Sequence, residues 1–178
     1  IVGYASIFDI GITRSVIREI AIYKRNKDEI LKILSTSAVI VEALGIIAGF
    51  LITIFNTKIS EFLNVSKFVT KDFLDSLAIV AFSIPLYLLT QVWCSLLEGR
   101  EEFLKLNIYK TFSSTMVVVF PALALLIESS LSYAVMGLLV ARFLSLLLIK
   151  LYCRDFSSNF KFHNYVFKRL ISFGGWVA

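Results

Sequence analysis

Charged side chains beside or inside long apolar runs are the residues of this sequence that could do chemistry. Asp9 lies in such a run, and Arg14, Arg18 and Arg25 follow it at spacings of four and seven. On a single helix these arginines would share one face. An acid in the membrane and a ladder of cations at its edge indicate a route for an anion, because guanidinium groups pair well with phosphate. The same residues are also typical of an ordinary stop-transfer flank, and the local pattern leaves both interpretations open.

Two more charges lie deep inside apolar runs. Glu42 stands within 33–55, and Arg142 stands within 131–149. A buried glutamate can pack helices through a hydrogen bond, or it can bind a coupling ion. A mid-span arginine costs about 3 kcal/mol or more unless it faces water or an acid, or extends to the headgroups. The candidates for binding an anionic substrate are therefore Arg14, Arg18 and Arg142, and those for coupling to a proton or sodium ion are Asp9 and Glu42.

Patterns of catalytic or metal-binding residues do not occur in the sequence. The two cysteines, Cys94 and Cys153, and the single histidine, His163, lack the spacing of a metal site. The net charge of +5 is not arranged as a basic patch interleaved for base contacts, so nucleic acid is not expected as a partner. We expect no catalytic residues, no metal and no cofactor.

Composition places the chain in a membrane. Hydrophobic residues make up 58% of its 178 residues and charged residues 17%, below the roughly 25% of soluble domains. The mean hydropathy is +0.82, and the apolar residues fall in runs of the roughly 20 residues that cross a bilayer as a helix. The sequence therefore predicts an all-α, polytopic transmembrane helical bundle. The expected helices cover approximately 1–22, 30–55, 74–97, 108–127, 131–151 and 168–178, with a short interfacial helix around 59–63.

Small residues predict where these helices meet. Gly45 and Gly49 form a G-x-x-x-G pattern, which lets helix backbones approach closely. Pro85 should kink the helix that contains it. Because the sequence opens and closes inside apolar runs, we interpret it as a single helical lobe, 1–178, truncated at both ends.

Loop charges predict the orientation of the lobe. The loops around 24–29, 98–107 and 152–168 are rich in Lys and Arg. The opposite side carries far fewer basic residues, namely Lys58, Lys67 and Lys71. Since basic loops stay inside, we expect the first set of loops to be cytoplasmic.

Three short motifs resemble one known family. The first, Asp-Ile-Gly-Ile-x-Arg, starts at Asp9, includes Gly11 and is followed by Arg-x-x-Ala from Arg18. The second consists of Gly99, Glu102 with Phe103, and Asn107, and the third is Gly174-Gly175-Trp176. They resemble the polysaccharide flippases, which are O-antigen and repeat-unit exporters of the multidrug/oligosaccharidyl-lipid/polysaccharide (MOP) superfamily.

The resemblance implies a fold and roles for the motif residues. The fold would be most of the N-terminal lobe of a MATE-like transporter with two six-helix lobes. Gly99 would permit a tight turn, Phe103 would anchor the chain in the interface, and Gly174 with Gly175 would form a deformable hinge.

The resemblance also implies a function, which is transport rather than enzymatic catalysis. The protein would flip an undecaprenyl-pyrophosphate-linked oligosaccharide, an O-antigen or capsule repeat unit, across the bacterial inner membrane. Its partners would be this lipid-linked oligosaccharide, the membrane lipid and a coupling ion. A sibling transporter (a drug/cation antiporter or a lipid II flippase) is the first alternative, and a membrane enzyme or structural partner of polysaccharide assembly is the second.

Overall fold

The fold consists of helices throughout the part of the chain that the structure describes. The structure is a computed structural model, and it describes residues 11–66, 68–156 and 161–177. The all-α fold class predicted from the sequence is confirmed. The elements are α1 (Ile12–Ile22), α2 (Lys27–Ile54), α3 (Asn56–Phe62), α4 (Thr70–Gly99), α5 (Phe103–Ile127), α6 (Leu131–Tyr152), the 3₁₀ turn η2 (Arg154–Phe156) and α7 (Asn164–Val177).

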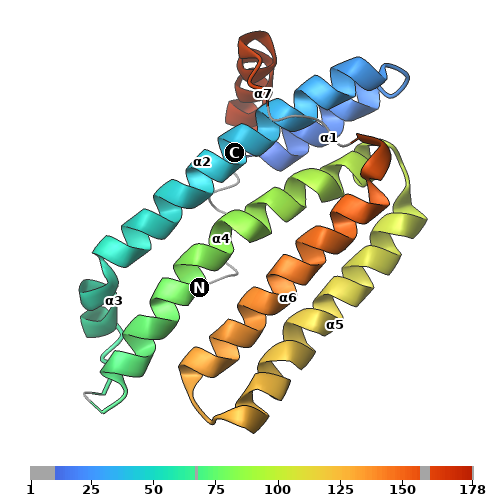
Figure 1. Cartoon of the computed structure of the whole chain (residues 1–178). Helices are drawn as coiled ribbons and strands as arrows, with labels where there is room; N and C mark the ends of the chain where they lie inside the picture. The colour runs from blue at the N-terminus through green and yellow to red at the C-terminus, as the bar shows by residue number, and fades with distance from the viewer. Residues whose placement is uncertain (1–10, 67, 157–160, 178) are drawn as a thin grey trace.

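The four long helices lie side by side in one row, in the order α2, α4, α6, α5 (Figure 1). They contain 28, 30, 22 and 25 residues in that order, and each is long and apolar enough to cross a bilayer. The chain is therefore a multi-pass membrane protein. Helix α4 is the most buried of the four because α2 covers one of its sides and α6 covers the other.

Several helices begin earlier than the apolar runs predict. Helix α4 starts at Thr70 rather than 74, α5 at Phe103 rather than 108, and α7 at Asn164 rather than 168. The first turn of α4 and the first turns of α5 contain charged or polar residues, and such turns can stay helical where a span leaves the apolar layer. The short helix expected around 59–63 is present as α3, although it begins at Asn56.

The predicted arginine ladder is shorter than the sequence pattern implies. Helix α1 ends at Ile22, so Arg25 lies in the following turn and does not share a helical face with Arg14 and Arg18. The chain turns here because Asn26 caps α2, with its side-chain oxygen accepting a hydrogen bond of 3.2 Å from the N–H of Glu29. The inclusion of Arg25 in the ladder was therefore wrong.

Glycines on α2 set its distance from α4. A Cβ added at Gly45 would lie 2.8 Å from the Cα of Pro85, and one at Gly49 would lie 2.8 Å from the carbonyl oxygen of Ala81. Pro85 lacks the N–H that would bond to that carbonyl, so the proline of α4 and the glycines of α2 meet at the same place. The close approach predicted from G-x-x-x-G is confirmed.

The two ends of the row differ in charge and in their contacts. We call the end where α1, α4 and α6 finish and α2, α5 and α7 begin the basic end, because the three basic loops meet there (Figure 1). At the opposite end Asp72 of α4 caps α6, accepting hydrogen bonds from the backbone N–H of Leu131 (2.8 Å) and Ser132 (3.1 Å). This cap ties the starts of α4 and α6 together.

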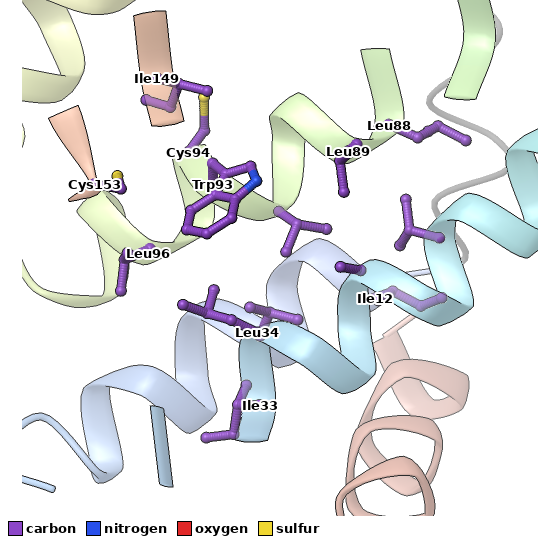
Figure 2. Close-up of a cluster of buried hydrophobic side chains, with 14 of the residues drawn as sticks. Ile12, Ile33, Leu34, Leu88, Leu89, Trp93, Cys94, Leu96, Ile149 and Cys153 are labelled. Atoms are coloured by element: carbon purple, nitrogen blue, oxygen red, sulfur yellow. The ribbon is translucent and has the colours of Figure 1, made fainter. Parts of the chain in front are cut away.

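The main apolar core lies toward the basic end. Figure 2 shows Ile12 of α1 with Ile33 and Leu34 of α2, facing a row of α4 side chains that includes Leu88 and Trp93. Val16 and Ile20 of α1 and Ile149 of α6 are fully buried in the same cluster. Helix α1 is thus held firmly against α2 and α4.

Candidate anion-binding site

The first candidate residues lie on α1. Gly11 precedes the helix with φ 68°, a left-handed conformation that favours glycine, and its carbonyl accepts hydrogen bonds of 3.1 Å from both the N–H and the hydroxyl of Ser15. Arg14 and Arg18 are exposed on the helix. Asp9 lies outside the described residues, so its proposed role stays a prediction.

A buried carboxylate next to Arg18 was missed by the sequence analysis. Glu19 is only 3% exposed, and its two oxygens lie 3.4 Å from Nη1 of Arg18 and 2.5 Å from Nη2 of Arg169 on α7. Arg169 also donates a 3.2 Å hydrogen bond to the hydroxyl of Tyr23 and stacks 4.6 Å from its ring centroid. The sequence could have indicated this burial, because Glu19 lies on the same face of the amphipathic α1 as the apolar residues Ile12 and Val16.

Arg142 lines a cavity of about 440 Å³ between α4, α5 and α6. Its guanidinium lies 4.5 Å from the ring centroid of Tyr87 on α4, and its Nε is buried without a hydrogen-bond partner. The other polar groups lining the cavity include Gln91 and Lys110. Ser113, which also lines it, donates a 2.9 Å hydrogen bond to Ser145. The cavity therefore presents two cations and several neutral donors, a set suited to an anionic group bearing hydroxyls.

Glu42 occupies a different cavity. This space of about 490 Å³ lies between α2 and α4 and is mostly apolar, with Gly45, Phe82 and Pro85 among its lining residues. Oε2 of Glu42 is buried without a hydrogen-bond partner. The structure therefore does not show the interhelical hydrogen bond that a packing role requires of this oxygen. It also separates Glu42 from Arg142, so these two do not form the charge pair that their depths would allow.

Gly99 lies at a close contact between two helices and does not form the tight turn that was expected of it. Gly99 ends α4 where α1 crosses it, and an added Cβ would lie 2.8 Å from the carbonyl oxygen of Ile17 and from Ile20. The left-handed residue of the turn is Glu101, with φ 61°. The assignment of the tight turn to Gly99 was wrong, because this glycine is required for the close approach of two helices.

The remaining motif residues lie on α5 and α7. Phe103 is 53% exposed at the start of α5, and Asn107 is exposed one turn later. The backbone of α7 is helical through Gly174, Gly175 and Trp176, whose side chains lie outside the description. The interface anchor and the hinge both stay predictions.

Ion pairs connect the basic loops. Lys24 lies 2.7 Å from Glu101, and Glu102 lies 2.7 Å from Arg100 and 2.6 Å from Lys105. The hydrogen bond from Lys24 lowers the pKa of Glu101, and those from Lys105 and Arg100 lower the pKa of Glu102. These acids stay ionised near neutral pH and offset part of the positive charge of this end.

Together, the row of spanning helices and the cationic mid-span cavity define a class, that of multi-pass α-helical membrane proteins with a transporter-like lobe. A solved MOP superfamily transporter from Pyrococcus furiosus has the same fold, with a TM-score of 0.73 at 13% sequence identity over 96% of this chain and 39% of that chain.

Comparison of sequences narrows the class to a family. The model of the family described as polysaccharide biosynthesis protein matches residues 1–178. A Shigella flexneri protein named "Putative O-antigen transporter" is 41% identical over 180 residues, which is 100% of this chain and 43% of the relative. The chain belongs to the polysaccharide biosynthesis protein family, as its motifs indicated, and it spans less than half the length of that relative.

Proposed function

We propose that this protein flips an undecaprenyl-pyrophosphate-linked oligosaccharide, an O-antigen or capsule repeat unit, across the bacterial inner membrane. The observation that carries the proposal is a cationic cavity at mid-span in a chain 41% identical to a protein named as an O-antigen transporter. The cargo headgroup has a pyrophosphate, which must be neutralised in the membrane, and hydroxyl-rich sugars. The cavity of Arg142 offers cations for the first and neutral donors for the second.

The arrangement supports a path from the basic end to mid-span. With the basic end in the cytoplasm, Arg14 and Arg18 would meet the pyrophosphate first and Arg142 would meet it halfway. Guanidinium groups suit both steps because they bind phosphate oxygens in pairs. Rocking of helical lobes would then expose the cavity to each side in turn.

The energy for transport would come from a coupling ion, a proton or sodium. Glu42, with a buried oxygen that lacks a partner in an apolar cavity, is the described candidate to bind it. Asp9 is the other candidate.

The competing functions fit the cavities less well. A drug/cation antiporter would need acids where this cavity has Arg142 and Lys110. A lipid II flippase carries a related anionic lipid, and glycan specificity separates it from the proposed function.

Complementation tests the proposal. The full-length protein would be expressed in a bacterium that lacks its own O-antigen flippase but makes the matching repeat unit. Restored surface polysaccharide, with less lipid-linked repeat unit left in the inner leaflet, is the expected result. Unchanged accumulation of the lipid-linked repeat unit, with the protein present in the membrane, would overturn the proposal.

A further inference from the structure

Helix α7 is attached to the bundle at a small contact with α1 and α2. Two of its side chains, Val166 and Leu170, are fully buried there. The hydroxyl of Tyr165 donates a 3.1 Å hydrogen bond to Glu29 at the edge of this contact. The N–H of His163, just before the helix, donates a 3.2 Å hydrogen bond to Thr36, and Arg169 contacts Tyr23. The ion pair between Arg169 and Glu19 adds a charged contact with a buried carboxylate to this attachment.

The exposure of the three charges is uneven. The side chain of Glu19 is 4% exposed, whereas those of Arg18 and Arg169 are 49% and 31% exposed. A solute at the basic end can therefore reach Arg18 and the exposed part of Arg169, whose Nε and Nη2 are buried, while the carboxylate stays covered.

The ion pair cannot simply come apart. Removing one partner of a buried pair leaves an uncompensated charge, which is strongly unfavourable. Tyr23 is a neutral partner of Arg169 and does not cancel its charge. Release of α7 from α1 would take the carboxylate away from Arg169, and a second anion would compensate the charge of this arginine. A phosphate group suits this exchange, because it accepts paired hydrogen bonds from guanidinium and carries at least the charge of a carboxylate.

We propose that Glu19 and Arg169 form a latch that holds α7 on α1, and that a phosphate-bearing anion opens the latch by taking the place of Glu19 on the guanidinium group of Arg169, while Glu19 keeps Arg18 as its partner. The latch would couple arrival of the anionic headgroup to movement of α7. The identity of the ligand rests on the proposed function, whereas the latch itself rests on the geometry of α1 and α7.

Cysteine accessibility tests the latch. In a full-length protein carrying Cys94→Ala, Cys153→Ala and Val166→Cys, reconstituted in lipid nanodiscs, the buried thiol at 166 should react slowly with a maleimide. Glu19→Gln, which keeps the shape but removes the charge, should raise the labelling rate at least tenfold. The control is Glu101→Gln, which breaks an ion pair at the same end with Lys24 and should leave the rate unchanged. Equal rates for the parent and Glu19→Gln would overturn the latch.

Inorganic pyrophosphate tests the exchange of anions. Millimolar pyrophosphate should accelerate labelling of the parent, whereas potassium chloride at the same ionic strength should not. It should have no further effect in Glu19→Gln, where the latch is already open. Equal acceleration by both salts would mean charge screening and would overturn recognition of phosphate, as would an absence of acceleration by pyrophosphate.

A second variant guards against misfolding. If Glu19→Gln fails to give a monodisperse protein, the exchanged pair Glu19→Arg with Arg169→Glu restores opposite charges and should return slow labelling. Fast labelling by the exchanged pair would count against the latch. Failure of the parent protein to export polysaccharide would instead overturn the proposed function, so the two failures are distinguishable.

Discussion

Arg142 holds a permanent charge in the middle of an apolar helix. Its contact with the Tyr87 ring contributes about 2 kcal/mol at a desolvated site, less than the roughly 3 kcal/mol or more that burying the charge costs. The Nε of Arg142 has no hydrogen-bond partner, and a cavity lies beside it. An anionic ligand in this cavity would neutralise the guanidinium and accept a hydrogen bond from Nε. At the scale of single residues, Arg142 is the strongest candidate for binding the cargo.

Replacing Arg142 tests whether it binds the cargo. Arg142→Ala should abolish export of surface polysaccharide at a normal protein level. Arg142→Lys should reduce export by about tenfold, because loss of the paired hydrogen bonds costs about 1.4 kcal/mol. Phe143→Ala, at an exposed neighbouring position, is the matched control and should export normally. Wild-type export by Arg142→Ala would refute a role in cargo binding.

Glu42 makes the second prediction at this scale. If its carboxylate binds the coupling ion, Glu42→Gln should leave folding intact and make transport insensitive to the proton or sodium gradient, because the amide carries no charge. The measurement is export into vesicles with and without an imposed gradient. A gradient response equal to that of the parent would show that Glu42 is not the coupling group.

At the scale of elements, α2 and α4 approach each other closely, as the G-x-x-x-G pattern predicted. The glycines of α2 pack against Ala81 and Pro85 of α4 without space for a methyl group. Tight backbone contact of this kind is a main source of stability between helices in lipid, where apolar burial contributes little.

Gly45→Ala should therefore destabilise the bundle. The new Cβ would stand 2.8 Å from the backbone of Pro85, so one helix must shift, at a cost of about 1–3 kcal/mol. Thermal unfolding of the detergent-solubilised protein should show a lower midpoint. Ala43→Val, on the exposed face of the same helix, adds bulk without this contact and should leave the midpoint unchanged. Equal midpoints for both variants would argue against the packing shown here.

At the scale of the whole molecule, three basic loops from distant parts of the sequence gather at one end of the bundle (Figure 1). Their ion pairs with Glu101 and Glu102 neutralise part of this charge, and the loops stay rich in Lys and Arg. Because basic loops tend to stay inside, we expect this end to lie in the cytoplasm.

Cysteine labelling in intact cells should establish this orientation. In a background without native cysteines, Asp155→Cys should be protected from an impermeant maleimide until the cells are broken. Glu61→Cys, on α3 at the opposite end, should react at once. Neither change alters the number of basic residues, so the topology signal is kept. Reaction of Asp155→Cys in intact cells would reverse the orientation.

Much of this architecture follows from the sequence because hydropathy, loop charge and small-residue spacing are local signals. The apolar runs predicted the spanning helices, the loops predicted a basic end, and Gly45 with Gly49 predicted a close helix contact. Placing Arg25 on the helical face of Arg14 and Arg18 was wrong, since α1 ends at Ile22 and the cap at Asn26 starts α2.

Only the tertiary structure decided which charges meet. The pairing of Glu19 with Arg169, the stacking of Arg142 on Tyr87 and the isolation of Glu42 depend on which helices are neighbours and on how each is rotated about its axis. These are non-local properties of the packed bundle. A one-dimensional pattern gives the depth of a charge along its own helix, but the partner across the interface is chosen by packing between helices.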